Sequence, residues 1–266
     1  MVSIVTICWN MSRELWLTAQ SVLAQKDIEI EYIIVDKEST DGTARTILDI
    51  QCACQSRNIP LRWSSEADKG IYDAMNKGVR RASGEWIVFM NAGDRFAHEE
   101  ALSQLVNPET ARQADLLYGS TILERDFGTV LVRPRPLSYL QRKMAFCHQA
   151  MAVRTALLRE HPFDLRFPVC ADFEFVHWCY TSGKRLREMD TTVAIFDGTK
   201  GNSRQHRLKL DRECALITGR YATLEWKLKH ALKVVEVAFN TLVRSVMPRR
   251  LTNAMRRRIY RNKTKS

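Results

Sequence analysis

The stretch FMNAGD, residues 89–94, joins an apolar run to two polar side chains. The preceding residues, GEWIV, extend the apolar run, which predicts a short strand buried on both faces of a sheet. Asn91 and Asp94 would then lie just beyond the carboxyl end of this strand. An amide and a carboxylate at that edge indicate either a ligand site or an Asx turn that caps the next helix.

The residues on both sides of this stretch alternate between strand and helix patterns. Strands are expected at residues 2–7, 29–36, 61–65 and 85–90, with a further extended segment at 115–118. Helices, with apolar residues three or four positions apart, are expected at residues 13–25, 43–55, 70–82 and 101–106. This alternation is typical of α/β proteins with a Rossmann-like, mostly parallel sheet flanked by helices.

Polar residues follow all four of these strands, and they include Asn10, Asp36, Asp68, Asn91 and Asp94. Ligands of parallel sheets bind at this carboxyl edge. The sequence has neither G-x-G-x-x-G after the first strand nor a P-loop, so phosphate must be held without these loops. Three carboxylates would repel phosphate unless a divalent cation lies between them, and Mg²⁺ or Mn²⁺ suits that position. We expect Asp94 to bind the metal and Asn91 to orient it or a ligand hydroxyl.

The second part of the chain, after residue 118, loses the regular alternation. A hairpin is expected around residues 126–128, and the apolar segment that follows contains His148 and Gln149. The sequence ADFEF, residues 171–175, predicts the start of a helix with acids in its first turn. This part of the chain is expected to cover the polar edge and to bind a second substrate.

Composition limits the class of protein. With 266 residues and 45% apolar content, the chain can bury a full core, as one domain or as one domain with an appendage. Its seven cysteines are odd in number and show no C-x-x-C spacing, which favours reduced thiols in the cytosol. The first residues, MVSIVTICWN, predict a strand rather than a signal peptide, and no apolar run is long enough to span a bilayer.

The basic character of the chain is concentrated at its end. The formal net charge is +11, but residues 204–266 hold 17 Lys or Arg and four Asp or Glu, so residues 1–203 carry −2. An amphipathic helix from residue 225 and the basic segment after it suit an anionic membrane surface. A solvated helix that packs on the domain is the alternative. Nucleic acid is not an expected partner, because no nucleic-acid-binding motif accompanies the charge.

Several motifs, in order, resemble a known family. VSIVTICWN, IIVDKESTDGT, SEADKGIYDAMNKGVRRASGEWIVFMNAGD and CHQA resemble the family 2 inverting glycosyltransferases of the GT-A fold, in particular bacterial enzymes of colanic acid, capsule and O-antigen assembly. The resemblance covers about residues 1–200. It implies a glycosyltransferase domain at 1–203, with a nucleotide-sugar-binding half at 1–118 and an acceptor-side half at 119–203, followed by a basic helical extension at 204–266.

The resemblance also implies residue roles. Thr6 and Asn10 would line the nucleotide pocket, Asp36 would bind the nucleobase, and Asp68 would lie near base and ribose. Asn76 would lie near the donor, and Asp94 matches the metal-binding acid of the family's D-x-D motif. Two departures stand out: Ala92 replaces the first acid of D-x-D, and Lys37-Glu38 replace residues that are usually small.

An inverting transfer needs a general base on one side of the anomeric carbon and charge stabilisation on the other. The resemblance places the base at the start of the helix at 171–175, where we expect Asp172, with Glu174 as the second choice. The alternative is that acids in the first turn only complement the helix dipole and have no catalytic role. His148 and Gln149 are expected near the acceptor or the diphosphate. Arg204 and His206, in a segment resembling a lid, are expected to meet the diphosphate.

The leading interpretation is a cytosolic glycosyltransferase, peripheral on the inner face of the cytoplasmic membrane. It would use a nucleoside-diphosphate-sugar donor and Mg²⁺ or Mn²⁺ to extend a lipid-linked glycan in bacterial exopolysaccharide synthesis. One alternative is a sugar-phosphate nucleotidyltransferase, although CWNMSRELW does not form the basic, Gly-rich phosphate loop that this class needs. The other is a non-catalytic domain that binds a partner or a membrane.

Overall fold

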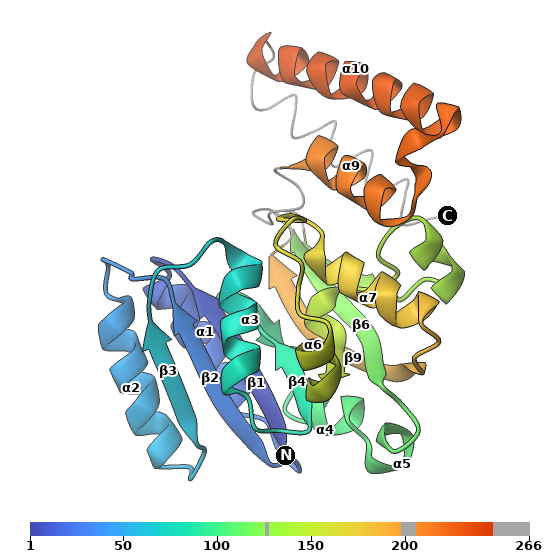
Figure 1. Ribbon diagram of the computed structural model, residues 1–266. Coiled ribbons are helices and arrows are strands. Elements are labelled where there is room, and N and C mark those ends of the chain that lie inside the picture. The colour runs from blue at the N-terminus through green and yellow to red at the C-terminus, as the bar shows by residue number, and fades with distance from the viewer. Residues whose placement is uncertain (126–127, 198–205, 247–266) are drawn as a thin grey trace. The chain divides into compact units, whose positions relative to one another are not determined.

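The computed structural model describes residues 1–125, 128–197 and 206–246 (Figure 1). The chain divides between residues 205 and 206 into two compact units. The first unit holds the sheet, and the described part of the second unit, residues 206–246, is mainly helical.

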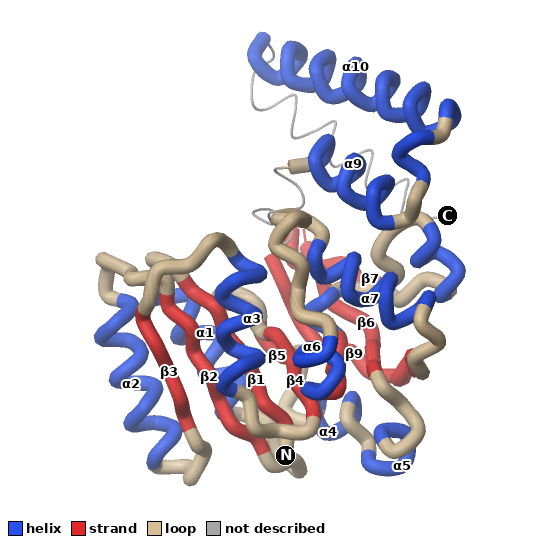
Figure 2. The backbone as a smooth tube through the Cα atoms, viewed as in Figure 1, coloured by secondary structure: helices blue, strands red, loops and turns tan. Residues whose placement is uncertain are grey.

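The first unit is built on one nine-stranded sheet, drawn in red in Figure 2, with the order β3-β2-β1-β4-β8-β6-β9-β5 and with β7 paired to β6. The strands of the first half are β1 (Val2–Cys8), β2 (Ile30–Asp36), β3 (Leu61–Ser65), β4 (Trp86–Phe89) and β5 (Arg95–Phe96). Those of the second half are β6 (Leu116–Arg125), β7 (Gly128–Val132), β8 (Met151–Arg154) and β9 (Leu186–Asp197).

Strands β3, β2, β1 and β4 are parallel, as the alternation of strands and helices predicts. Their register aligns Cys8 with Asp36 and Asp36 with Ser65, so the first three strands end at the same edge of the sheet. The strands β1, β2 and β4 are buried along their whole length, which explains their continuous Val and Ile content.

Helices cover both faces of this half of the sheet (Figure 1). Apolar side chains of α1 (Ser12–Leu23), α2 (Thr43–Gln55) and α4 (Ala101–Leu105) form one core with β1, β2 and β4. Helix α3 (Ile71–Arg81) packs on the opposite face, where Gly78 lies against Val5. The predicted bounds of α2 and β3 are confirmed, and those of the other early elements agree within two residues.

The second half of the sheet is mixed. Strand β8 pairs antiparallel with both β4 and β6, whereas β9 runs parallel to β6 and antiparallel to β5. The predicted hairpin is confirmed as β6 and β7, which pair with Arg125 opposite Gly128. The predicted acidic helix start is confirmed as α7 (Ala171–Thr181). The other elements described in this unit are α5 (Pro108–Ala111), η1 (Leu137–Gln141), η2 (His148–Ala150) and α6 (Thr155–Glu160).

An aromatic cluster joins α3 to the segment before α7. The ring of Phe163 lies 5.5 Å from that of Tyr72 on α3, 5.4 Å from Phe89 at the end of β4, and 5.8 Å from Phe175 on α7. Apolar burial therefore holds the amino-terminal turns of α3 and α7 beside the end of β4.

The second unit contains α9 (Arg207–Ile217), η3 (Arg220–Ala222) and α10 (Leu224–Val246), and α10 lies where the sequence predicts an amphipathic helix. Asp211 of α9 accepts hydrogen bonds from His230 and Lys233 of α10, and the ring of Trp226 stacks on His230 and lies tilted against Tyr221. Across the described ranges, no helix combines the length and apolar content needed to pass through a bilayer.

Candidate active site

The carboxylate of Asp36, at the end of β2, is buried and hydrogen-bonded on both oxygens. Oδ1 accepts from Ser39 Oγ (2.5 Å), and Oδ2 accepts from the Ser39 amide (3.0 Å) and Ser65 Oγ (2.6 Å). The thiol of Cys8 also faces Oδ1 at 3.6 Å. Asp36 thus joins the ends of three strands and shapes the loop after β2.

Asp68, after β3, pairs with the residue that follows Asp36. Lys37 Nζ lies 3.0 Å from Asp68 Oδ1, and the Gly70 amide donates to the same oxygen (2.7 Å). Lys37 also lies over the ring of Trp9, 5.3 Å from its centroid. Trp9 is 59% exposed, so an aromatic ring, a cation and a carboxylate line this edge of the sheet.

Thr6 and Asn10 both bind other parts of the chain. Thr6, fully buried, donates to the Met90 carbonyl (2.7 Å) and accepts from Tyr32 Oη (3.0 Å). Asn10 has a positive φ of 51°, and its side-chain oxygen accepts from the Thr40 amide (2.8 Å). Asn10 thereby holds the loop that contains Lys37.

Asn76, on α3, bonds to one backbone residue through both ends of its amide. Nδ2 donates to the Phe163 carbonyl (2.9 Å), and Oδ1 accepts from the Phe163 amide (3.0 Å). Its side chain therefore clamps the segment before α7 to α3.

Asn91 and Asp94 lie together after β4, within a turn closed by the Asp94 amide and the Asn91 carbonyl (2.9 Å). Thr18 of α1 donates to the Asp94 carbonyl (2.6 Å) and so holds the turn on the first helix. Burial raises the pKa of Asp94 to about 6, although His148 and Gln149 act in the opposite direction.

The side chains of these two residues suit a hard divalent cation. Within residues 1–125, 128–197 and 206–246, the buried side-chain oxygen of Asn91 has no hydrogen-bond partner, and the Asp94 carboxylate accepts one bond, from Gln149 Nε2 (3.3 Å). Carboxylate and amide oxygens are the ligands that Mg²⁺ and Mn²⁺ accept. No group of three His, Cys, Asp or Glu that could hold a metal occurs in the described part of the chain. An ion at Asp94 would therefore need further ligands from its substrate.

His148 and Gln149, the first residues of η2, connect two acids. Gln149 bonds to Asp94, whereas His148 Nδ1 lies 3.4 Å from Asp172 Oδ2 and His148 Nε2 lies 3.3 Å from Asn91 Nδ2. Burial opposes protonation of His148, but the hydrogen bond and charge of Asp172 outweigh it and raise the pKa of the imidazole. Two consecutive side chains thus join the end of β4 to the start of α7.

Asp172 and Glu174 have different partners although both lie in the first turn of α7. Asp172 contacts His148, Tyr72 Oη (2.7 Å) and the Phe173 amide (2.9 Å). Burial alone would raise the pKa of Asp172, but these contacts, that of His148 first, hold it below the ordinary value. Glu174 pairs with His161 (3.0 Å), which stacks on Trp178. Asp172 therefore shares contacts with the Asp94 turn through η2, whereas Glu174 pairs with His161 at the end of α6.

The two remaining predicted residues are Arg204 and His206. Arg204 is outside the described residues. His206 is described at the start of α9 in the second unit, where it is exposed.

Tyr72 was missed by the reasoning from sequence. It stands in the G-I-Y-D-A-M-N-K-G segment, yet only its position one turn before Asn76 on a helix could have drawn attention to it. Its contact with Asp172 joins residues 100 positions apart, and no local pattern records such a contact.

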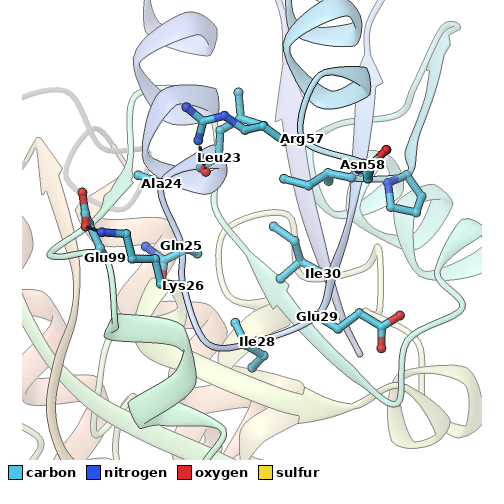
Figure 3. Close-up of a pocket in the computed structure, with 12 residues that line it drawn as sticks. Leu23, Ala24, Gln25, Lys26, Ile28, Glu29, Ile30, Arg57, Asn58 and Glu99 are labelled. Atoms are coloured by element: carbon cyan, nitrogen blue, oxygen red, sulfur yellow. Dashed lines mark hydrogen bonds and ion pairs between the residues drawn. The ribbon is translucent and has the colours of Figure 1, made fainter.

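A cavity of about 620 Å³ lies at the other end of the strands (Figure 3). It is lined by the last residue of α1, by the loops that follow α1 and α2, and by Ile30, the first residue of β2. Arg57 donates to the Leu23 carbonyl and Lys26 pairs with Glu99 at its border. Asp36 ends the same strand at the opposite edge, so this cavity is separate from the polar residues described above.

Comparison with known proteins places this arrangement in a family. The model of glycosyl transferase family 2 matches residues 3–160. The chain is 30% identical over 207 residues to a PGL/p-HBAD biosynthesis glycosyltransferase of Mycobacterium bovis, covering 76% of this chain and 79% of that protein. It is 26% identical to the Escherichia coli UDP-Glc:alpha-D-GlcNAc-diphosphoundecaprenol beta-1,3-glucosyltransferase WfaP, covering 73% of this chain and 74% of that protein.

A solved structure shows the fold. The mannosyltransferase PcManGT of Pyrobaculum calidifontis, in complex with GDP-Man and Mn²⁺, matches with a TM-score of 0.62 at 16% identity, over 97% of this chain and 79% of that chain. The first unit thus has the GT-A fold, as the sequence motifs imply. Because the family model covers more than half of the residues and a relative at 30% identity covers three quarters of them, the chain belongs to glycosyl transferase family 2.

Proposed function

We propose that this family 2 glycosyltransferase transfers a sugar, with inversion, from a nucleoside-diphosphate-sugar to a lipid-linked glycan. The observation that carries the proposal is the set of contacts Asp94–Gln149 and His148–Asp172, made by two consecutive residues. An inverting transfer needs a leaving-group site and a base on opposite sides of the anomeric carbon. The two contacts support a single site that contains both the leaving-group site and the base.

Asp94 and the unpartnered oxygen of Asn91 would hold Mg²⁺ or Mn²⁺. A bound cation would neutralise the charge that develops on the leaving diphosphate. Ala92 stands where the family usually has a second acid, so the protein supplies one carboxylate and the diphosphate supplies further oxygens.

Asp172 would be the general base. Its carboxylate takes the proton of the acceptor hydroxyl, the acceptor oxygen forms the bond to the anomeric carbon, and the bond to the diphosphate oxygen breaks. The lowered pKa keeps Asp172 ionised and ready to accept at neutral pH. Glu174 is the weaker candidate because both of its carboxylate oxygens lie within 3.1 Å of His161 Nε2.

The nucleotide would bind at the edge formed by β1, β2 and β3. Exposed Trp9 offers a surface for a base, and the Lys37–Asp68 pair offers a donor and an acceptor for base or ribose. Asp36, Thr6, Asn10 and Asn76 would act on the nucleotide indirectly, because their side chains hold the surrounding strands and loops.

A lipid-linked acceptor is supported by the E. coli relative, whose name specifies a diphosphoundecaprenol substrate. The extension would bring the enzyme to the inner face of an anionic cytoplasmic membrane. Leu224, Leu228, Leu232 and Val235 form an apolar stripe on α10, each at least 60% exposed. Arg204 and His206 stay predicted contacts of the diphosphate.

The test is a transfer assay with UDP-glucose, UDP-GlcNAc and GDP-mannose. The acceptor is a synthetic lipid-linked GlcNAc diphosphate, and product is detected by mass with Mn²⁺ or EDTA. We expect transfer from one donor, loss of transfer with EDTA, and loss by about a thousandfold or more in Asp172→Asn. Thermal stabilisation by the matching nucleoside diphosphate with Mn²⁺ should persist in this variant.

Glu174→Gln is the matched control, since it makes the same chemical change two residues away. It should keep most of the transfer activity. Full activity of Asp172→Asn, or loss of activity only in Glu174→Gln, would overturn the choice of base. Equal stabilisation with and without Mn²⁺ would overturn the role of the metal.

A further inference from the structure

Tyr72 contacts one carboxylate oxygen of Asp172, and His148 contacts the other. Its ring is buried in the first turn of α3, against Phe163, and its hydroxyl lies 2.7 Å from Asp172 Oδ1 and 3.1 Å from the Val169 carbonyl. The carboxylate is thereby held between α3 and η2.

The two oxygens of Asp172 have different surroundings. Oδ1 accepts from Tyr72 Oη (2.7 Å) and from the Phe173 amide (2.9 Å), whereas Oδ2 has the longer contact with His148 at 3.4 Å. Two short hydrogen bonds hold Oδ1 in place more firmly than the single longer contact holds Oδ2. Oδ2 therefore has the greater capacity to accept a further hydrogen bond, such as that of an acceptor hydroxyl.

We infer that Tyr72 is a positioning residue for transfer: it fixes Oδ1 so that Oδ2 faces the acceptor hydroxyl. The inference rests on the proposed role of Asp172 as the base. In the step, the acceptor proton moves to Oδ2 and the acceptor oxygen bonds to the anomeric carbon as the diphosphate leaves. Tyr72 donates to Oδ1 throughout and exchanges no proton with the substrate.

Tyr72 is itself held rigidly. Gly70 precedes α3 with a φ of +119°, a conformation that only glycine adopts easily, and Asp68 accepts a bond from its amide. One turn along α3, Asn76 clamps both backbone groups of Phe163, and the Phe163 ring packs on Tyr72. The turn at Gly70 and the contact with Phe163 thus place the ring and its hydroxyl.

The experiment compares Tyr72→Phe with Tyr180→Phe, using the donor and the lipid-linked GlcNAc diphosphate that give turnover in the assay above. Tyr180 is the control because it lies on α7, the helix of Asp172, and its replacement by Phe also removes a tyrosine hydroxyl. In Tyr72→Phe, kcat should fall roughly ten- to a hundredfold, because a hydrogen bond to a charged group is lost. The donor KM should stay within about twofold, and Tyr180→Phe should match the parent.

The pH profile separates positioning from a purely structural role. The titratable groups around Asp172 are Tyr72 on α3, His148 on η2 and Cys147 before η2. Removal of the Tyr72 hydroxyl removes a bond to the ionised form, so the acid limb of kcat/KM should move to higher pH.

Three outcomes of this experiment would contradict the inference. An unchanged kcat and acid limb in Tyr72→Phe, with Asp172→Asn inactive, would overturn the role of Tyr72 and leave the base intact. Full activity in both variants would instead overturn the base itself. A fall in kcat with a matching loss of thermal stability and no shift of the acid limb would show a structural role only, which also overturns the inference.

Discussion

Glu31 and Asp36 lie on the same strand, and both carboxylates accept hydrogen bonds from other segments of the chain. Glu31 accepts hydrogen bonds from Ser3 Oγ (2.5 Å), Ser83 Oγ (2.8 Å) and the Gly84 amide (3.0 Å). This places the turn before β4 against β1 and β2. A buried carboxylate with several donors is stable as an ion, whereas an unpaired one would be costly.

Replacement of Glu31 by Gln should destabilise the first unit by about 2 kcal/mol at pH 7, because charged acceptors of several hydrogen bonds are lost. Burial opposes ionisation of Glu31, but its hydrogen bonds outweigh burial and keep its pKa below the ordinary value. The stability that it contributes is complete above the unfolded pKa, about 4.3, and is lost as pH falls through the folded pKa. Urea unfolding from pH 7 to pH 3.5 measures the difference.

Glu29→Gln is the control for this change, since Glu29 lies two residues away with a 78% exposed side chain. Its effect should stay within about 0.5 kcal/mol at every pH. A gap between parent and Glu31→Gln that widens below pH 4 would contradict the role given to the ionised carboxylate.

Helix α3 links the sheet to the site through three positions on its length. Tyr72 contacts Asp172, Asn76 contacts Phe163, and Gly78 lies against Val5 of β1. A shift of α3 relative to β1 would therefore also move Tyr72 and its contact with Asp172, the proposed base. A glycine is needed at 78 for close approach, because an added Cβ would overlap Val5 Cγ1.

We predict that Gly78→Ala destabilises the protein by about 1–3 kcal/mol, through overpacking against β1. The helix must shift outwards, which also lowers kcat by moving Tyr72. In the double variant Gly78→Ala with Val5→Ala, the second change makes room for the new methyl group. Urea unfolding should give a loss smaller than the sum of the two single losses. Additive losses would show that Gly78 does not set the approach of α3 to the sheet.

At the scale of the whole molecule, charge and apolar exposure are concentrated in the extension. Helix α10 uses one side for Asp211, Tyr221 and α9, through Trp226, His230 and Lys233, and the apolar stripe lies on its other side. The same spacing continues in the sequence at Phe239 and Leu242, and residues 247–266 add eight Lys or Arg and no acid. An apolar stripe with a basic continuation matches the chemistry of an anionic bilayer surface.

Sedimentation with vesicles tests this surface. The full chain should bind vesicles that contain phosphatidylglycerol, bind pure phosphatidylcholine weakly, and release with rising salt. Combined Leu228→Ser and Leu232→Ser should weaken binding by about tenfold or more, because each leucine loses its burial in the lipid interface.

Leu48→Ser, a change of the 46% exposed leucine on α2, is the control and should bind as the parent does. The membrane surface would be contradicted if the double variant bound vesicles as well as the parent does. It would also be contradicted if the parent did not bind anionic vesicles and formed a dimer instead. Donor-dependent thermal stabilisation should be the same in all three proteins, which separates membrane binding from the transferase site.

The sequence by itself determined the early strands and helices, their order and the edge where polar residues gather. The bounds of α2 and β3 could be predicted because local chemistry sets them: Asp41 binds the Thr43 amide at the start of α2, and Pro60 precedes β3. Hydrophobic periodicity and cap residues act within one or two turns, so a single sequence records them. The family motifs are also local, and they implied the GT-A fold.

Tertiary structure alone decided how the polar residues are used. Asp36 binds Ser39 and Ser65, Asn76 binds Phe163, and Asp68 binds Lys37, and the motifs did not predict these contacts. The sequence pattern also did not predict that β8 inserts antiparallel between β4 and β6, or that Tyr72 contacts Asp172. These contacts join residues far apart in the chain, and their energies depend on burial and distance, which a sequence does not record until the chain has folded.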